Sequence, residues 1–95
     1  RHVDVKTKDR NCFAEPHYTA SVEARQRSFD CDWYAFFNYN KSERVMQWMG
    51  WYRKSDYFLD AKKANKGDVD TQNFWTVSAD CYQLEYGHLQ KGRHQ

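Results

Sequence analysis

The first half of the chain contains the acids, bases and cations that a hydrolase needs to transfer protons and stabilise developing charge. The residues of these types are Glu15, His17, Arg25, Arg27 and Glu43. Their spacing follows no known catalytic motif, and the chain has no G-x-S-x-G turn, phosphate loop or dinucleotide fingerprint. We therefore assign no catalytic residue and no cofactor, and keep a small ribonuclease-like hydrolase only as an alternative.

Residues that bind metals also occur, but their spacing is weak. Cys12 and His17 lie five residues apart, without the further ligands of a zinc site. Asp68, Asp70 and Asn73 resemble the start of a calcium loop, which would need a glycine at its sixth position and a glutamate at its twelfth. We predict no metal site and a polar turn at residues 67–73.

The clearest candidate for binding is residues 48–54, WMGWYRK, where aromatic and basic side chains are interleaved. Trp, Tyr and Arg are the residues that dominate interface hot spots. We predict Trp48, Trp51, Tyr52 and Arg53 as anchors, with Lys54 beside them. The alternative is that the rings pack in the core while Arg53 and Lys54 emerge at a strand end.

The secondary-structure elements that would position these residues can be predicted from the spacing of apolar residues along the chain. In residues 31–40, CDWYAFFNYN, the odd-numbered positions are all apolar and the even-numbered positions are mixed, as in a strand with one face on a core. We expect this strand to bury Trp33, Ala35, Phe37 and Tyr39. Tyr34 and Phe36 would then lie on the other face and add to the binding surface.

Alternating patterns predict further strands at residues 3–6, 18–25, 44–54, 74–79 and 82–86. Because the 44–54 segment is apolar on both faces, we expect it to be central.

Residues 55–67 instead carry helix signals, with Ser55 as N-cap and Gly67 beyond the end. We predict one domain, residues 1–95, that is mainly β: a small five- or six-stranded antiparallel sandwich or barrel with at most one short helix. A mostly helical domain, using residues 70–89 as a helix, is the alternative.

Composition favours an aromatic core and a surface that still carries rings. The chain has six Phe, four Trp and seven Tyr in 95 residues, with few aliphatic residues. So many rings exceed what one small core can bury, and the surplus must lie on the surface. The net charge is +2 with interleaved signs, which disfavours a nucleic-acid groove. No stretch is apolar and long enough for a membrane span.

The cysteines and the first residue bear on the cellular compartment. A Cys31–Cys81 disulfide would close a long loop and contribute roughly 3 to 4 kcal/mol, leaving Cys12 over. Asn40 begins an N-glycosylation sequon, NKS, in a predicted turn. With a start at Arg1, these features suggest a secreted protein whose leader has been removed. The alternatives are three reduced cysteines in a cytoplasmic protein, or a disulfide that joins Cys12 to Cys31 or Cys81.

The aromatic stretch around Trp33, followed about fifty residues later by Cys81, resembles small secreted fungal effectors of the MAX type. This resemblance implies a six-stranded β-sandwich with a disulfide, which binds host proteins, in some cases through a strand edge. Residues 29–37 are similar to the first lipocalin motif and residues 74–86 to a later lipocalin strand. Residues 51–55 resemble a framework strand of immunoglobulin variable domains. We expect a non-catalytic protein-binding module; a binder of a small apolar or sugar ligand is the alternative.

Overall fold

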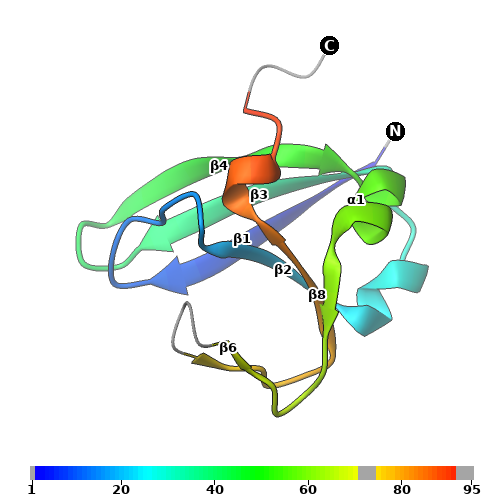
Figure 1. Cartoon of the computed structure of the whole chain (residues 1–95). Coiled ribbons are helices and arrows are strands. Elements are labelled where there is room, and N and C mark those ends of the chain that lie inside the picture. The colour runs from blue at the N-terminus through cyan, green and yellow to red at the C-terminus, as the bar shows by residue number, and fades with distance from the viewer. Residues whose placement is uncertain (1, 71–74, 92–95) are drawn as a thin grey trace.

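The computed structural model describes residues 2–70 and 75–91, in which two three-stranded sheets face each other (Figure 1). The first sheet has the order β1-β3-β4, formed by β1 (Val3–Arg10), β3 (Trp33–Asn40) and β4 (Val45–Arg53). β3 and β4 form an antiparallel hairpin, whereas β1 runs parallel to β3. The mainly β prediction is confirmed, with one parallel pair where an antiparallel sheet was expected.

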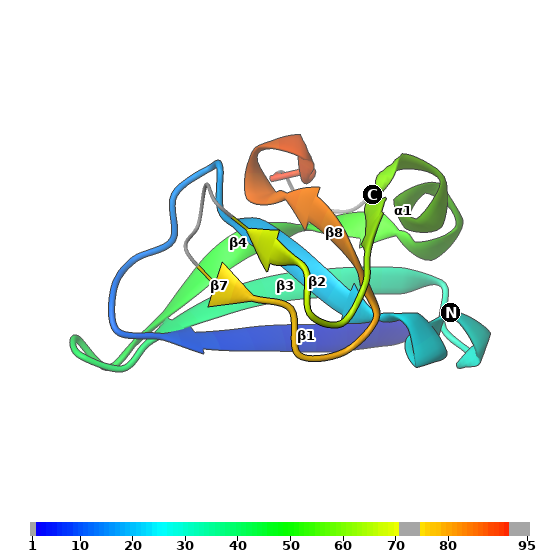
Figure 2. The same ribbon diagram turned by 60° about the horizontal axis from the view of Figure 1, so that its bottom comes forward.

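The second sheet is antiparallel and has the order β2-β8-β5, formed by β2 (Thr19–Glu23), β8 (Cys81–Glu85) and β5 (Lys62–Ala64). The smaller elements are η1 (Ala24–Ser28), α1 (Lys54–Asp60), β6 (Val69–Asp70), β7 (Trp75–Thr76) and η2 (Tyr86–His88). Figure 2 shows α1 and η1 together at one end of the first sheet, with the β3–β4 turn at the other end.

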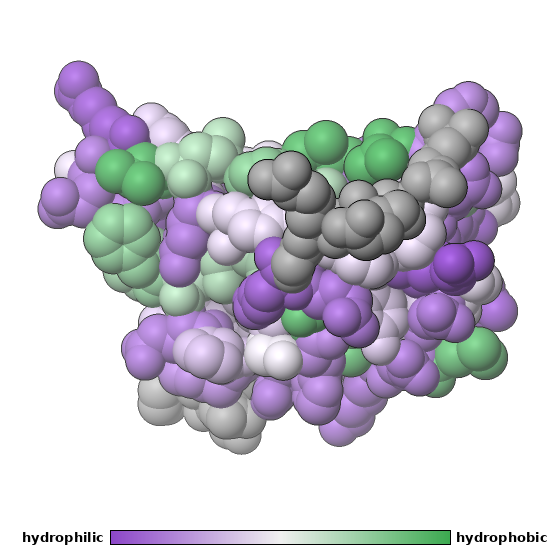
Figure 3. Space-filling model, turned by 90° about the horizontal axis from the view of Figure 1, so that it is seen from above, coloured by the Kyte–Doolittle hydropathy of each residue, from purple (hydrophilic) through white to green (hydrophobic). Residues whose placement is uncertain are grey.

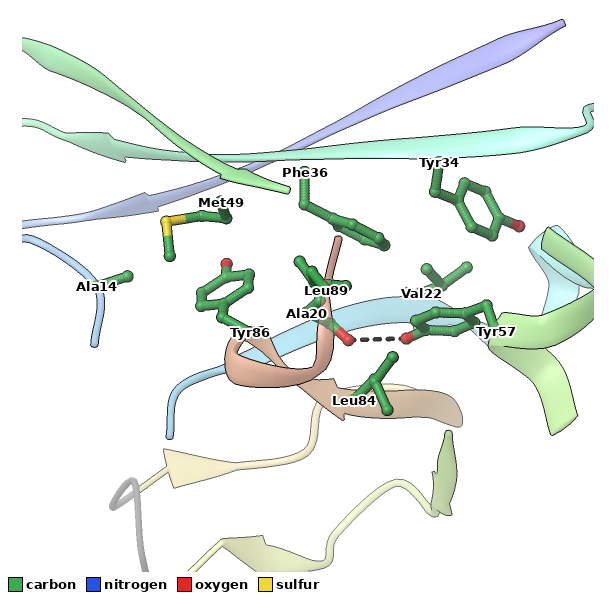
Figure 4. Close-up of a cluster of buried hydrophobic side chains, with 10 residues drawn as sticks. All are labelled: Ala14, Ala20, Val22, Tyr34, Phe36, Met49, Tyr57, Leu84, Tyr86 and Leu89. Carbon is green, nitrogen blue, oxygen red and sulfur yellow. Dashed lines mark hydrogen bonds between the residues drawn. The ribbon is translucent and has the colours of Figure 1, made fainter. Parts of the chain in front are cut away.

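The core forms where rings from the first sheet and α1 meet the second sheet (Figure 4). The Tyr57 ring lies 5.6 Å from the Tyr34 ring and 5.8 Å from the Phe36 ring, measured between centroids. Its hydroxyl lies 2.7 Å from the carbonyl oxygen of Ala20 and 2.9 Å from that of Tyr82. Burial raises the pKa of this hydroxyl well above its usual value, so it is a neutral donor that ties α1 to the second sheet.

A buried polar network ties the loop after β1 to the first sheet. Asn38 is 0 % exposed; its Oδ1 accepts a bond of 2.7 Å from Arg10, and its Nδ2 donates to Gln47 Oε1 and the Cys12 carbonyl, both at 3.1 Å. Gln47 in turn bonds the backbone N–H and C=O of Ala14 at 2.8 and 3.1 Å. Both side-chain amides are therefore satisfied, which makes their burial tolerable.

β3 buries the face opposite to the one predicted. Tyr34 and Phe36 are 0 % and 2 % exposed, whereas the predicted core residues Trp33, Ala35, Phe37 and Tyr39 are half-buried. The prediction chose the wholly apolar positions as the core face, whereas the buried positions also include the two asparagines of this strand. Hydrogen bonds compensate both: Asn38 joins the network above, and Asn40 Oδ1 accepts the Glu43 N–H at 3.1 Å.

The helix predicted at 55–67 is present, but it begins two residues before its predicted N-cap position would allow and is much shorter than predicted. α1 covers Lys54–Asp60 with Arg53, not Ser55, at its N-cap, and no side chain caps it. The backbone becomes extended at Ala61, because the next residues form β5 in the second sheet. There Lys62 pairs with Gln83, and Ala64 pairs with Cys81. Sheet pairing thus overrides the local helix preference of the lysines.

Other predicted elements differ in place rather than in type. Segment 44–54 forms β4 at an edge of its sheet rather than in the centre, and residues 81–85 form a strand, which excludes the helix predicted as an alternative at 70–89. Residues 75–76 form the short β7. Asn73 and Phe74 of the predicted turn and strand lie outside the described residues.

The predicted disulfide and glycosylation site are not supported by the structure. Cys12, Cys31 and Cys81 are all free thiols. Cys31 packs against the main core, whereas Cys81 belongs to a second cluster with Ala64 and Val77. Asn40 is the last residue of β3 and is 2 % exposed, so its amide is inaccessible to a glycosyltransferase.

Candidate binding face

The side of the first sheet that points away from the core is called the outer face here. Directly paired residues on neighbouring strands share a face of a sheet, and the pairing with the odd-numbered residues of β3 defines its members. They are Val3, Val5, Thr7 and Asp9 of β1, Trp33, Ala35, Phe37 and Tyr39 of β3, and Met46, Trp48, Trp51 and Arg53 of β4.

Large apolar side chains on the outer face are open to solvent. Val3 and Val5 are 55 % and 58 % exposed, and Met46 and Trp48 are 54 % and 42 % exposed. Figure 3, seen from above, looks onto this side of the molecule and shows apolar surface at two margins of it. Several large apolar side chains exposed on one face are a feature of interaction sites in soluble proteins. The predicted surplus of rings on the surface is confirmed, since Phe13 and Phe29 are also about half exposed.

A β-bulge at Gly50 places two tryptophans on the same side. Trp48 and Trp51 are three residues apart, so a regular strand would point them to opposite faces. The register shifts between Phe36, which pairs with Gly50, and Phe37, which pairs with Trp48. Both indoles therefore join the outer face, while the intervening Met49 is buried at 4 %.

The rings of the outer face are held by contacts with one another. Trp33 and Trp51 meet edge to face with centroids 4.9 Å apart, and Phe37 and Trp48 do so at 5.1 Å. The Arg53 guanidinium lies over the Trp33 ring, 4.7 Å from its centroid. Such packing fixes the side chains before any partner arrives, which lowers the entropy cost of binding.

The segment after η2 braces the β4 edge. Trp51 and Gln90 exchange two backbone hydrogen bonds of 2.9 and 3.0 Å, and Trp48 Nε1 donates to the Lys91 carbonyl at 3.2 Å. The Lys91 ammonium donates to the carbonyls of Met49 and Tyr86, and burial lowers its pKa. The two indoles of β4 are thereby positioned from outside the sheet as well.

The structure separates the predicted binding residues into three groups. Trp48, Trp51 and Arg53 lie together on the outer face. Tyr34 and Phe36 lie in the core, so their prediction as contact residues is wrong. Tyr52 and Lys54 belong to neither the outer face nor the buried group.

Tyr52 pairs with Tyr34 on the inner face, and its hydroxyl donates to Asp60 Oδ2 at 2.5 Å. This hydrogen bond, with some burial, raises the pKa of Tyr52 to about 12. Lys54 opens α1, and its ammonium donates to the Phe29 carbonyl. Both residues therefore connect α1 to its surroundings.

Most residues of the outer face were not predicted as binding residues from the sequence. Val3, Val5, Trp33, Phe37 and Met46 were assigned to strands, but not to a surface. The alternation of Val3 and Val5 with Asp4 and Lys6 was a visible signal, but it does not say which side is solvent. That information comes from the pairing of β1 with β3.

The residues with hydrolase chemistry do not converge. Arg25 pairs with Glu23 at 3.1 Å, Arg27 donates to the Tyr82 hydroxyl at 3.3 Å, and the His17 ring packs on Tyr18 at 4.8 Å. Within residues 2–70 and 75–91, no ion pair joins His17 to an acid, and no cluster of three or more His, Cys, Asp or Glu could hold a metal ion.

Comparisons with protein-family models, with curated proteins and with solved structures found no match. The described part of the chain contains no helix of the length and hydropathy needed to cross a membrane.

Proposed function

We propose that this protein is a non-catalytic module that binds another protein through the outer face of its first sheet. The observation that carries the proposal is the solvent exposure of four large apolar side chains there, Val3, Val5, Met46 and Trp48. Burying exposed valine and methionine side chains against an apolar partner is favourable. The free energy gained is roughly 25 cal/mol for each Å² of apolar surface removed from water.

The chemistry of the outer face favours a protein over a small ligand. The hollow that adjoins the outer face at Tyr52 and Gln90 has a volume of about 200 Å³, below the roughly 300 Å³ of a typical small-molecule pocket. A larger hollow at the α1 end is lined by Arg27, Arg53 and Lys54, unlike the mostly apolar lining of such pockets. A sheet face with aromatic residues in the middle, aliphatic residues at one margin and an arginine at one end instead resembles the composition of protein interfaces.

Pairing at the edge of β1 is a less favourable mode than contact with the outer face. β1 is an edge strand, but Asp4 and Lys6 alternate along it with the valines and form an ion pair of 2.9 Å. Charged side chains on an edge strand are a device that discourages addition of a further strand. The predicted secretion and the likeness to MAX effectors stay predictions.

The test is affinity capture from extracts of the source with Val5→Ser and Trp48→Ser variants. Val69→Ser is the matched control, because Val69 is 65 % exposed and lies on β6, away from the outer face. The proposal expects a protein that the wild type and Val69→Ser retain, and that both outer-face variants lose. Equal retention by all four proteins would place the contact elsewhere.

A further inference from the structure

A basic groove lies at the end of the first sheet that carries α1 and η1. Its volume is about 700 Å³, and it is lined by Arg27, Cys31, Asp32, Trp33, Arg53, Lys54, Ser55, Phe58 and Leu59. Trp33 and Arg53 belong to both the groove and the outer face, so the two surfaces are continuous. A partner seated on the outer face therefore meets the groove at its edge.

The arginines of the groove are supported by aromatic rings. Arg53 lies over the Trp33 ring at 4.7 Å, and Arg27 lies over the Phe58 ring at 5.5 Å. Stacking holds a guanidinium in one orientation while leaving its N–H donors at the ring edge, where they can reach an anion. Arg27 also donates from one Nη to the Tyr82 hydroxyl at 3.3 Å, which helps to orient its guanidinium and leaves its other N–H groups for a ligand.

The lining of the groove carries more positive than negative charge. Its three cations are Arg27, Arg53 and Lys54. Asp32 is the one acid in the lining, and its Oδ2 already accepts the His2 N–H at 3.0 Å. Burial raises the pKa of the Cys31 thiol, so that it stays neutral. Three cations facing one carboxylate leave an excess of positive charge beside an apolar wall.

We infer that the basic groove receives an acidic segment of the protein partner. A carboxylate would bind between Arg27 and Arg53, whose planar forks suit bidentate bonds to carboxylates. An apolar residue next to it would pack against Phe58 and Leu59, the latter being 81 % exposed. This inference rests on the proposed function and adds the chemistry of the partner to it.

The experiment is selection of a phage-displayed library of random dodecapeptides on the wild-type protein. The enriched peptide is then synthesised with a dye and titrated by fluorescence anisotropy against wild type, Arg27→Glu and Arg27→Lys. The matched control is Arg25→Glu, because Arg25 lies on the same η1 element but bonds Glu23 and does not line the groove. A dye-labelled single-stranded oligonucleotide is titrated alongside, and circular dichroism checks the fold of each variant.

The inference expects peptides in which Asp or Glu lies next to an apolar residue. Binding should fall about ten- to a hundredfold in Arg27→Glu, as expected for loss of a charge-assisted hydrogen bond, stay near wild type in Arg25→Glu, and recover in part in Arg27→Lys. Four results would each overturn the inference. They are enriched peptides without acidic residues, no enrichment at all, equal peptide binding by Arg27→Glu and wild type, and a preference for the oligonucleotide over the peptide.

Variants of the outer face separate this inference from the proposed function, because Arg27 lies outside that face. Peptides that Val5→Ser loses and Arg27→Glu keeps would leave the outer face as the binding site and remove the groove. The same conclusion would follow if Val5→Ser lost a captured protein partner while the peptide selection enriched nothing. The outer face would then be the binding site, and the groove would not. If Val5→Ser and Arg27→Glu both keep peptide binding and partner capture, the proposed function and the groove inference are both refuted.

Discussion

Replacing Gly50 with alanine should be one of the most damaging small changes in the chain. Gly50 has a φ of 137°, a backbone angle that residues other than glycine rarely adopt. A Cβ there would lie 2.7 Å from the Gln90 carbonyl oxygen and 2.7 Å from Leu89 Cβ. Backbone strain costs about 1 to 3 kcal/mol, and overpacking against a braced segment adds about 1 to 3 kcal/mol. Gly50→Ala should therefore lower the free energy of unfolding by about 2 to 6 kcal/mol.

The chain offers two glycine controls that separate strain from overpacking. Gly67 has a φ of 94°, but a Cβ there meets nothing within 4 Å, so Gly67→Ala should carry the strain alone, about 1 to 3 kcal/mol. A Cβ on Gly87 would make ordinary contacts of 3.4 and 3.5 Å with Pro16, so Gly87→Ala should change stability by less than about 1 kcal/mol.

Urea unfolding followed by tryptophan fluorescence measures all three glycine variants in one assay. The expected order of destabilisation is Gly50, then Gly67, then Gly87. If Gly50→Ala costs no more than Gly67→Ala, the close approach of the Gln90 segment to β4 does not exist. The bulge that brings Trp48 and Trp51 together would then lack its support.

Three further outcomes are expected. Asn38→Ala should lower the free energy of unfolding by about 1 to 3 kcal/mol in the same urea assay, because Gln47 and the Cys12 carbonyl lose a buried partner; a change within error would show that the network contributes nothing. Ultraviolet absorbance titration should show a tyrosine with a pKa of about 12 that falls towards 10 in Asp60→Asn, and the contribution of Tyr52 to stability, complete below pH 10, should be lost as pH rises to about 12; an unchanged titration in the variant would refute the Tyr52–Asp60 bond. Alkylation of the denatured, unreduced protein should add three groups by mass, one for each free thiol, whereas a single group would restore the predicted disulfide.

The class of fold could be predicted because strand alternation is a local property. Ala20 and Val22 alternate with polar residues and are both buried, as the pattern requires. The turn after Asn40 and the start of α1 were likewise marked by local signals. These features depend on residues within a few positions of one another.

The orientation of β3 could not be predicted, because its polar positions are satisfied by distant residues. Asn38 reaches Arg10 and Cys12, which are 28 and 26 residues away. Comparing the number of apolar residues at odd-numbered and even-numbered positions of β3 therefore predicted the wrong face of the strand to be buried. For the same reason Tyr34 and Phe36 were assigned to a surface although they form the centre of the core.

Only a small part of the candidate site could be predicted, because a bulge changes which face of β4 each residue lies on. Without it, Trp48 and Trp51 lie on opposite faces, and the segment looks like a central strand with two buried sides. Gly50 was the available signal, since glycine inside a strand pattern often marks a bulge. The valines of β1 required the parallel pairing with β3, which no local pattern encodes.

Site-specific photo-crosslinking tests the role of the outer face most directly. A photoreactive benzophenone side chain replaces Val5 in one protein and Val69 in another, two valines of similar exposure on different surfaces. After irradiation in extracts of the source, the outer-face position should give a discrete protein adduct that the Val69 position does not. Adducts of equal yield at both positions, or adducts at Val69 alone, would contradict the assignment of the outer face as the binding surface.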